Sequence, residues 1–401
     1  MALGALNARS TALQSRSAGG RRPQTLVAAA AGPHIAVVGA GVAGLTSALQ
    51  VLEQIPGSCV SVIAEQFHSD LVSAGAAGYW EPYKLSGTPQ DKIFKWGKAT
   101  FDHLTDLVHS SDAAAAGVST CYATSLFRER TPDPFWAPIV PGFCRARQEQ
   151  LRRYGQSVDW GGPFAAEASG AEGAGKAEAW VDGYCFNSLL CEGRLYMRWL
   201  TDRIVAAGGQ LEQRGLAGVE ELGEEGYDGV VVACGLGAVG LLRDEECYPI
   251  RGQIARVRAP WVRECVFGHF GDEVTYIIPN REWVVVGGTG QVGDWRTSIN
   301  VGDADAIMGR ARQLLPSLED AELLSHWVGL RPGRTQLRLE LEMRRLSPGA
   351  TSSTDGDDGG GGGGAGATPV VYNYGHGGAG LTLAWGTAGD AVELLRGALG
   401  V

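Results

Sequence analysis

The sequence predicts an α/β protein in which a parallel-sheet domain is interleaved with an antiparallel-sheet domain. Three observations support this class. An apolar run at His34–Val38 is followed by glycines and then by a helical pattern, which is the order strand, turn, helix. A second apolar run that ends in glycines, Gly229–Gly237, indicates that the chain returns to the first sheet late. Between residues 250 and 290, apolar and polar residues alternate, which is typical of antiparallel strands.

The first of these units carries a Gly-x-Gly-x-x-Gly motif made by Gly39, Gly41 and Gly44. The first glycine permits a tight turn, the second lets a pyrophosphate approach the backbone, and the third lets the helix pack on the strand. The N–H groups that open the helix, Val42 among them, then hold phosphate without a basic side chain. Glu65 ends the next apolar run, where a carboxylate accepts ribose hydroxyls. The unit predicts an adenine dinucleotide site in a Rossmann-like domain, the alternative being a packing turn in a glycine-rich chain.

Composition and charge exclude several classes of protein. A chain of 401 residues with 44% hydrophobic residues forms one large or two ordinary domains with a substantial core. No apolar stretch reaches the roughly 18 residues of a membrane helix. The formal net charge of −10 argues against general binding to nucleic acid or to an anionic membrane. Eight scattered cysteines, with no Cys-x-x-Cys pair and no histidine cluster, indicate reduced thiols and no metal site.

The first 33 residues differ from the rest in composition. They contain several Ser and Ala, no Asp or Glu, and the four arginines Arg9, Arg16, Arg21 and Arg22. This composition is typical of an organellar transit peptide, a plain disordered tail being the alternative. We therefore expect a plastid or mitochondrial location. A peroxisome is the alternative, although Ala398–Val401 is not an address of the Ser-Lys-Leu type.

The remaining patterns place elements along the chain. Helices are expected at 90–109, 189–207 and 303–315 and after Leu381, with a surface insertion at 164–178 and a flexible glycine-rich loop at 349–367. The dinucleotide-binding domain is accordingly expected at about 34–85, 205–250 and 368–401, and the substrate domain at about 86–204 and 251–345.

Two late segments carry residues suited to binding a substrate. Arg331 stands before Pro332, and a guanidinium matches a carboxylate with two parallel hydrogen bonds; a surface ion pair is the alternative. In Tyr372–Gly386 four glycines precede a helical run, which suits close approach to a flat ligand whose negative charge the helix N-terminus stabilises. The alternative there is a simple loop-to-helix turn. His376, within this segment, is interpreted as a positioning residue rather than a base.

The chain resembles the D-amino-acid oxidase family of flavoproteins, which includes D-aspartate oxidases. The matching segments occur in family order over residues 34–396. They are Val38–Leu45, Ala76–Tyr83, Arg251–Ile254, Ala259–Trp261, Tyr276–Pro279, Gly287–Gly288, Gly329–Pro332 and Asn373–Gly378.

The resemblance implies roles for individual residues. Arg331 would bind the substrate carboxylate, Tyr276 would position it, and the carbonyl near Gly378 would accept from the substrate amine. FAD would be the cofactor. It would be bound by Gly39, Gly41, Val42, Gly44, Glu65, Ala77, Gly78, Leu216, Gly377, Gly378, Gly380, Leu381 and Thr382.

The implied reaction is oxidative deamination of a D-amino acid by hydride transfer to flavin N5, with oxygen as the final acceptor. The products are a 2-oxo acid, ammonia and hydrogen peroxide, and catalysis rests on positioning rather than on a side-chain base.

Three departures from the family bear on the substrate. The segment between Val266 and Tyr276 is shorter than the tyrosine-bearing lid of animal D-amino-acid oxidases. Gly290 stands where D-aspartate oxidases have arginine, and Glu81 stands where a neutral residue is expected. Neutral or basic D-amino acids are therefore the expected substrates. A D-aspartate oxidase, a flavin amine dehydrogenase and a non-catalytic flavin-binding module are the alternatives, and the assembly state, a homodimer included, stays open.

Overall fold

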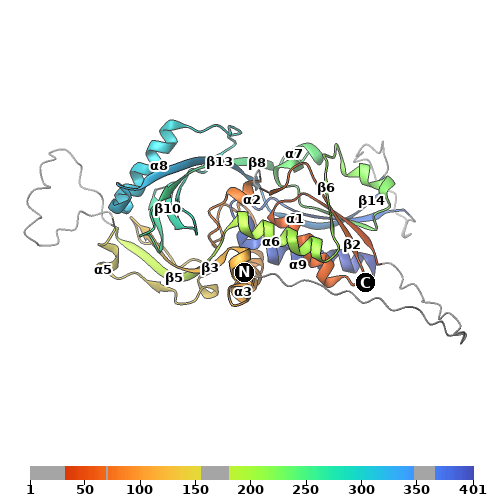
Figure 1. Cartoon of the computed structure of the whole chain (residues 1–401), viewed down its shortest axis with the longest axis horizontal. Coiled ribbons are helices and arrows are strands. Elements are labelled where there is room, and N and C mark those ends of the chain that lie inside the picture. Colours follow the sequence, from red (N-terminus) through yellow and green to blue (C-terminus); the bar gives the residue numbers. More distant parts are fainter. Residues whose placement is uncertain (1–31, 69–70, 155–179, 272, 347–365) are drawn as a thin grey trace, which may run out of the picture. The chain divides into compact units, whose positions relative to one another are not determined.

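The computed structural model describes residues 32–68, 71–154, 180–271, 273–346 and 366–401 (Figure 1). The surface insertion expected at 164–178 lies outside the described residues. So do the transit peptide expected at 1–33 and the glycine-rich loop expected at 349–367, apart from the last two residues of each. In the part that is described, the chain forms two sheets and the helices that pack on them.

The first sheet has six strands in the order β14-β15-β7-β1-β2-β6. Their bounds are β1 His34–Val38, β2 Cys59–Ala64, β6 Gln210–Gln213, β7 Gly229–Val232, β14 Arg338–Arg344 and β15 Thr368–Tyr374. The central strands run parallel, with β1 between β2 and β7, and β15 follows on β7. Their side chains are buried on both faces, which explains the continuous apolar runs in the sequence. Strands from the start, middle and end of the chain thus share one sheet, as the late return of the chain predicted.

Helices pack beside this sheet. The long ones are α1 Val42–Gln54, α3 Gln90–Val108, α6 Gly193–Ala206 and α9 Gly380–Leu399. Helix α1 contacts both α6 and α9, and α3 contacts α9, so the four form one layer (Figure 1). Shorter helices of the described chain, not all of them beside this sheet, are α2 Val72–Gly75, α4 Ala113–Ala116, α5 Gln148–Leu151 and α7 Ala238–Leu241. The helices expected at 90–109 and after Leu381 are confirmed.

The helix predicted at 189–207 starts later in the structure than in the prediction. Residues up to Cys191 belong to a strand, and the helix begins at Gly193. Leu189 and Leu190 pair with Thr120 and Ser119 of the neighbouring strand. The reason for the error is that a short apolar run fits a buried strand as well as a helix.

The second sheet has nine strands, in the order β12-β8-β11-β10-β9-β3-β5-β4 with β13 also paired to β8. Their bounds are β3 Val118–Phe127, β4 Cys144–Arg145, β5 Asp182–Cys191, β8 Cys247–Arg258, β9 Cys265–Phe270, β10 Glu273–Pro279, β11 Val284–Gly287, β12 Gln291–Val292 and β13 Glu322–Arg334. All neighbours are antiparallel except β3 and β9. Helix α8, Val301–Leu314, packs on β8, β10 and β11, where a helix was expected at 303–315.

Two helices and one strand differ from the expected division of the chain. Helices α3 and α6 were expected in the substrate domain but pack with α9 and α1 beside the first sheet. β14 pairs with β15 from Arg338↔Tyr374 to Arg344↔Thr368, and therefore belongs to the first sheet. The second sheet ends with β13 at Arg334 rather than near residue 345. Alternating polar and apolar residues in β14 resemble those of the second sheet, so periodicity could not assign it.

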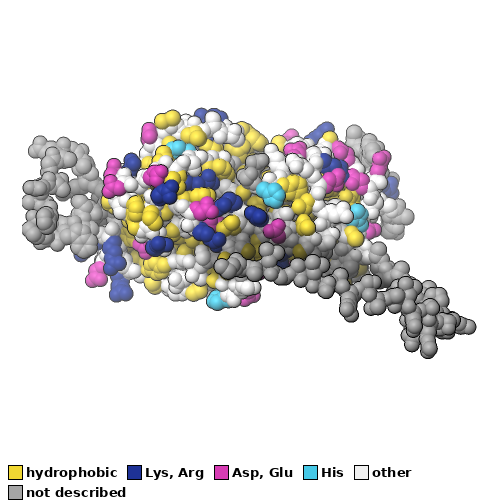
Figure 2. Space-filling view, viewed as in Figure 1, with side chains coloured by type: hydrophobic (Ala, Val, Ile, Leu, Met, Phe, Trp, Pro, Cys, Tyr) yellow, Lys and Arg dark blue, Asp and Glu magenta, His cyan; other side chains and the backbone are white. Residues whose placement is uncertain are grey.

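The described residues also bear on membrane crossing and surface charge. No helix among them is both long and apolar enough to span a membrane. Figure 2 shows basic and acidic side chains mixed over the visible face rather than gathered by sign.

Candidate active site

A cavity of about 1200 Å³ extends from the glycine turn after β1 to side chains of the second sheet. Nearly all the expected site residues line it. They are Gly39, Gly41, Val42, Glu65, Ala77, Gly78, Leu216, Tyr276, Arg331, Gly377, Gly378, Gly380, Leu381 and Thr382. Gly44 does not line it. A Cβ at Gly44 would overlap the Gly39 carbonyl, so this glycine lets α1 pack on the turn.

The end of the cavity next to β1 is suited to a pyrophosphate. Gly39 has a φ of 110°, and a Cβ there would collide with the Ala233 carbonyl. Helix α1 starts after Gly41 with no side-chain cap and no acidic residue in its first turn. The Val42 N–H donates to Ser73 Oγ at 3.2 Å. Gly41, Val42 and Ala43 line the cavity, so the positive end of the helix faces it, as phosphate binding requires. Ser73 was missed because no motif marks it.

A second helix N-terminus faces the same cavity. Helix α9 begins at Gly380, again without a side-chain cap. The Thr382 hydroxyl donates to the Glu81 carbonyl at 3.0 Å and accepts from the Glu81 N–H at 3.3 Å, so it ties α9 to the 76–83 segment. A Cβ at Gly378 would collide with the Tyr83 ring. This close packing of backbone leaves a site suited to a flat ligand with charge near the helix end.

His376 lies beneath this segment. It is buried, and its Nε2 lies 3.1 Å from Thr387 Oγ1. Burial lowers the pKa of His376 to about 4, so the ring is neutral at physiological pH. This arrangement agrees with its interpretation as a positioning residue.

These features fit FAD. Two uncapped helix N-termini, a glycine turn that a Cβ would fill and a carboxylate at the end of β2 supply contacts for pyrophosphate, flavin and ribose. When bound, FAD supplies the acceptor for a hydride from the substrate.

Arg331 and Tyr276 come from β13 and β10 and line the cavity together. Arg331 Nη1 donates to the Thr289 carbonyl at 3.0 Å, and its Cζ lies 5.8 Å from the centre of the Tyr83 ring. Burial raises the pKa of Tyr83, and the nearby Arg331 charge opposes that shift. A guanidinium and phenols at one wall form a site for a carboxylate.

Glu81 contributes an acidic group to the same cavity. Burial raises the pKa of its carboxyl to about 8, so the group is largely neutral at pH 7 and ionises in mild alkali. Its surroundings include the hydroxyls of Tyr79, Tyr83 and Tyr184, whose pKa values its charge would raise.

Gly290 lies at the edge of this region. It is not among the cavity-lining residues. A Cβ at Gly290 would lie 3.4 Å from both the Tyr83 hydroxyl and Lys84 Cε, so Lys84 stands beside the position where D-aspartate oxidases have arginine. Sequence reasoning missed Lys84, because only the turn of the chain brings it there.

Two other arginines that could have served an acidic substrate already form salt bridges. Arg334 pairs with Asp244 and Glu246, and Arg296 pairs with Asp294.

The segment between Val266 and Tyr276, expected to be shorter than the lid of animal D-amino-acid oxidases, is part of a hairpin. Strands β9 and β10 pair up to Phe270↔Glu273. His269 of this hairpin lines the cavity and stacks on Phe127, with ring centres 4.2 Å apart. Burial lowers the pKa of His269 to about 4, so it adds no positive charge at pH 7.

Comparisons with known proteins identify the family. A family model described as FAD dependent oxidoreductase matches residues 34–394. The chain is 36% identical over 365 residues to the D-amino-acid oxidase of Rubrobacter xylanophilus, covering 90% of this chain and 96% of that protein. The chain belongs to the D-amino-acid oxidase family of FAD-dependent oxidoreductases. It is also 34% identical to the D-aspartate oxidase of Homo sapiens over 364 residues, 90% of this chain and 94% of that protein.

Solved structures share the fold at lower identity. The glycine oxidase of Geobacillus kaustophilus gives a TM-score of 0.65 at 18% identity, covering 91% of this chain and 95% of that one. The L-proline dehydrogenase of P. horikoshii gives a TM-score of 0.65 at 12% identity, covering 91% and 94%. The chain thus shares its fold with these two structures, and a shared fold does not by itself decide the substrate.

Proposed function

We propose that this FAD-dependent oxidoreductase oxidises D-amino acids, with neutral or basic side chains preferred. The balanced reaction consumes one D-amino acid, one oxygen and one water, and forms a 2-oxo acid, ammonia and hydrogen peroxide. The observation that carries the proposal is the cavity shared by Arg331, Tyr276 and the Gly378 backbone.

These groups suit the two polar ends of an amino acid. Arg331 offers N–H donors to the carboxylate, and the Tyr276 hydroxyl lies on the same wall. The carbonyl near Gly378 is the acceptor for the amine. Holding both ends orients the Cα–H, and such positioning accounts for much of an enzyme's rate advantage.

The preferred side chain follows from charge. An acidic substrate side chain needs a cation, because burying a carboxylate unpaired is costly. Gly290 supplies none, whereas Glu81 places an acid in the cavity. A neutral side chain avoids both problems, and a basic side chain is attracted to Glu81 once it ionises.

A peroxide assay of the purified protein on D- and L-amino acids tests the proposal. We expect kcat/KM for D-Ala or D-Met to exceed that for D-Asp by at least roughly tenfold, which is about 1.4 kcal/mol. The double variant Gly290→Arg, Glu81→Gln should narrow this ratio, and Gly309→Ala, where an added methyl meets nothing within 4 Å, is the control. Substrate oxidation that reduces a dye but yields no peroxide would indicate a dehydrogenase. No turnover on any D-amino acid would refute the proposal.

Lys84 favours a second candidate, a D-aspartate oxidase. Its ammonium lies 5.5 Å from the centre of the Tyr83 ring, beside Gly290, and can serve as the cation for an acidic side chain. Lys84→Ala distinguishes the two candidates. If the protein is a D-aspartate oxidase, the variant loses activity on D-Asp selectively. If neutral D-amino acids are the substrates, its activity on D-Ala stays unchanged.

A further inference from the structure

The two side chains at the carboxylate end of the cavity both lie flat over glycines of a neighbouring strand. Arg331 lies over Gly252 of β8, and Tyr276 lies over Gly287 and Gly288 at the end of β11. We call these three residues the glycine floor. None of these three glycines has a positive φ, so a left-handed backbone is not the reason for glycine at these positions. What distinguishes them is that the Arg331 and Tyr276 side chains occupy the space that a Cβ would take.

The contact at Gly252 is with the charged end of Arg331. Gly252 pairs with Gly329 and Arg331 pairs with Ile250, so the Arg331 side chain extends along β8 toward Gly252. A Cβ at Gly252 would overlap Nη1, Cζ and Nη2 of the guanidinium. These atoms end a flexible side chain. An added methyl therefore moves the guanidinium rather than the strand.

The contact at the other two glycines is with the phenol of Tyr276. Tyr276 pairs directly with Gly287 across β10 and β11. A Cβ at Gly287 would overlap the ring and hydroxyl of Tyr276, and one at Gly288 would approach the hydroxyl at 2.6 Å. The phenol therefore occupies the space that a side chain on β11 would fill.

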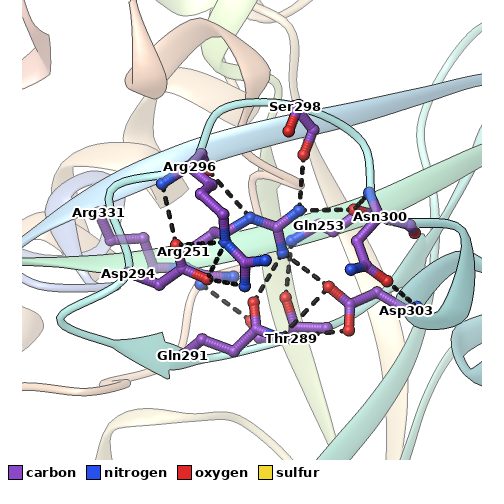
Figure 3. Close-up of polar contacts among 10 residues, drawn as sticks. All are labelled: Arg251, Gln253, Thr289, Gln291, Asp294, Arg296, Ser298, Asn300, Asp303 and Arg331. Atoms are coloured by element: carbon purple, nitrogen blue, oxygen red, sulfur yellow. Dashed lines mark hydrogen bonds and ion pairs between the residues drawn. The ribbon is translucent and has the colours of Figure 1, made fainter.

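The guanidinium is also held from the side, as Figure 3 shows. The Thr289 carbonyl accepts from Arg331 Nη1 at 3.0 Å. Thr289 is fixed in turn by Gln253, whose backbone N–H donates to Thr289 Oγ1 at 2.9 Å. Gln253 accepts from Arg251 at 2.8 Å and from the Asn300 N–H at 2.8 Å. The residues on both sides of Gly252 thus belong to a bonded network, and Gly252 leaves the gap in which the guanidinium rests.

We propose that the glycine floor positions Arg331 and Tyr276 for the substrate carboxylate, with Gly252 acting through Arg331 and Gly287 and Gly288 acting through Tyr276. The inference rests on the proposed function for its substrate. A carboxylate that binds through two parallel hydrogen bonds is sensitive to guanidinium placement, and a displacement of about 1 Å in such a site costs on the order of 100-fold in rate.

The experiment measures two quantities on FAD-loaded protein: KM and kcat for D-Ala, and the dissociation constant of benzoate by calorimetry. Gly252→Ala should lower kcat/KM for D-Ala on the order of 100-fold, chiefly through a higher KM, and should raise the benzoate dissociation constant. Its flavin absorbance and Tm should match those of the wild type, and Gly309→Ala, whose added methyl meets nothing within 4 Å, is the control for KM and benzoate binding. Benzoate binding reports on the carboxylate site even if D-Ala is not the substrate, so failure of this inference and failure of the proposed function give different results.

Double variants test whether each glycine acts through its partner. Gly252→Ala combined with Arg331→Ala should bind benzoate no more weakly than Arg331→Ala alone, since the methyl has no guanidinium left to displace. Adding Gly287→Ala to Tyr276→Phe should also weaken benzoate binding less than Gly287→Ala does in the wild type. Part of that loss should remain, because the phenylalanine ring still meets the added methyl. Benzoate binding by Gly252→Ala at the wild-type level would overturn the proposal. So would fully additive losses in the Arg331 double variant, or a loss of flavin in Gly252→Ala.

Discussion

Two arginines on paired strands use the same guanidinium group in opposite ways. Arg251 of β8 is 1% exposed and has a partner for every N–H. Its acceptors are Arg296 O, Gln291 Oε1, Asp303 Oδ2, Gln253 Oε1 and Ser298 O, at 2.6 to 3.0 Å (Figure 3). The guanidinium of Arg331, on β13, makes a single hydrogen bond among the described residues, to the Thr289 carbonyl, and Arg331 lines the cavity.

The difference shows what separates a structural arginine from a binding one. A guanidinium whose five donors are all satisfied has none left for a ligand, and here it fastens the 291–303 segment to β8. A half-buried guanidinium with spare donors at a cavity wall binds an anion that arrives later. Both residues lie in segments that match the same family, so the motif alone does not distinguish them. The count of satisfied donors does.

The largest expected effect comes from removing Arg331, the arginine with free hydrogen-bond donors. Arg331→Ala should lower kcat/KM for the preferred D-amino acid by on the order of 1000-fold, about 4 kcal/mol, because a buried charge-assisted carboxylate contact is lost. Tm and flavin absorbance should stay near wild type. Arg331→Lys should recover only part of the rate, since lysine keeps the charge but not the fork. Near-normal turnover by Arg331→Ala would mean that the carboxylate binds elsewhere.

Removing Arg251, whose donors are all hydrogen-bonded, should instead lower the stability of the fold. Arg251→Ala removes the cation that pairs with Asp303 and the donor to two backbone carbonyls, and breaking a buried pair on one side costs about 3–5 kcal/mol. Denaturant unfolding of the FAD-loaded protein measures this loss. Arg258→Ala, whose partner Glu322 is 63% exposed, is the matched control and should cost less than about 1 kcal/mol. A loss at Arg251 as small as that of the control would contradict the comparison.

The smallest expected effect is a pH dependence of carboxylate binding at Arg331. The Glu81 carboxyl, with its pKa raised to about 8 by burial, is neutral below that pH and charged above it. A second negative charge in the cavity opposes a bound carboxylate, so benzoate affinity should fall a few-fold as pH rises through about 8. Glu81→Gln should abolish this step. A step that persists in the variant would assign the titration to another group.

The same carboxyl links pH to stability. Its pKa in the folded protein lies above the ordinary value of 4.5. The folded state therefore binds more protons than the unfolded state between those values, and the contribution of Glu81 to stability declines as pH rises from about 4.5 to 8.

Local pattern was enough to predict the dinucleotide unit, whereas the carboxylate-binding role of Arg331 and Tyr276 needed the family resemblance. The strand, glycine turn and helix from His34 to Gln54 are encoded by neighbouring residues, so the sequence predicts them directly. Arg331 and Tyr276 were found through resemblance, and the structure places both at the cavity.

What sequence could not predict depends on distant pairing. The register of β13 on β8 decides that Gly252 lies under Arg331, and no local pattern encodes that register. Lys84 reaches Gly290 across some 200 positions of sequence, and β14 joined the first sheet by pairing rather than by periodicity. In each case the deciding contact joins residues that are far apart in the chain.

The hairpin of β14 and β15 also bears on how this protein can be engineered. Its seven cross-strand pairs begin at Arg338↔Tyr374, next to the Gly375–Gly378 segment of the site, and end at Arg344↔Thr368, where the chain between the two strands departs. The closure cost of a connection grows slowly with its length, by about 0.6 kcal/mol per doubling. A peptide tag or a reporter domain inserted between residues 347 and 365 therefore enters at the end of the hairpin away from the catalytic cavity, which makes this junction a practical place to attach an immobilisation handle to the enzyme.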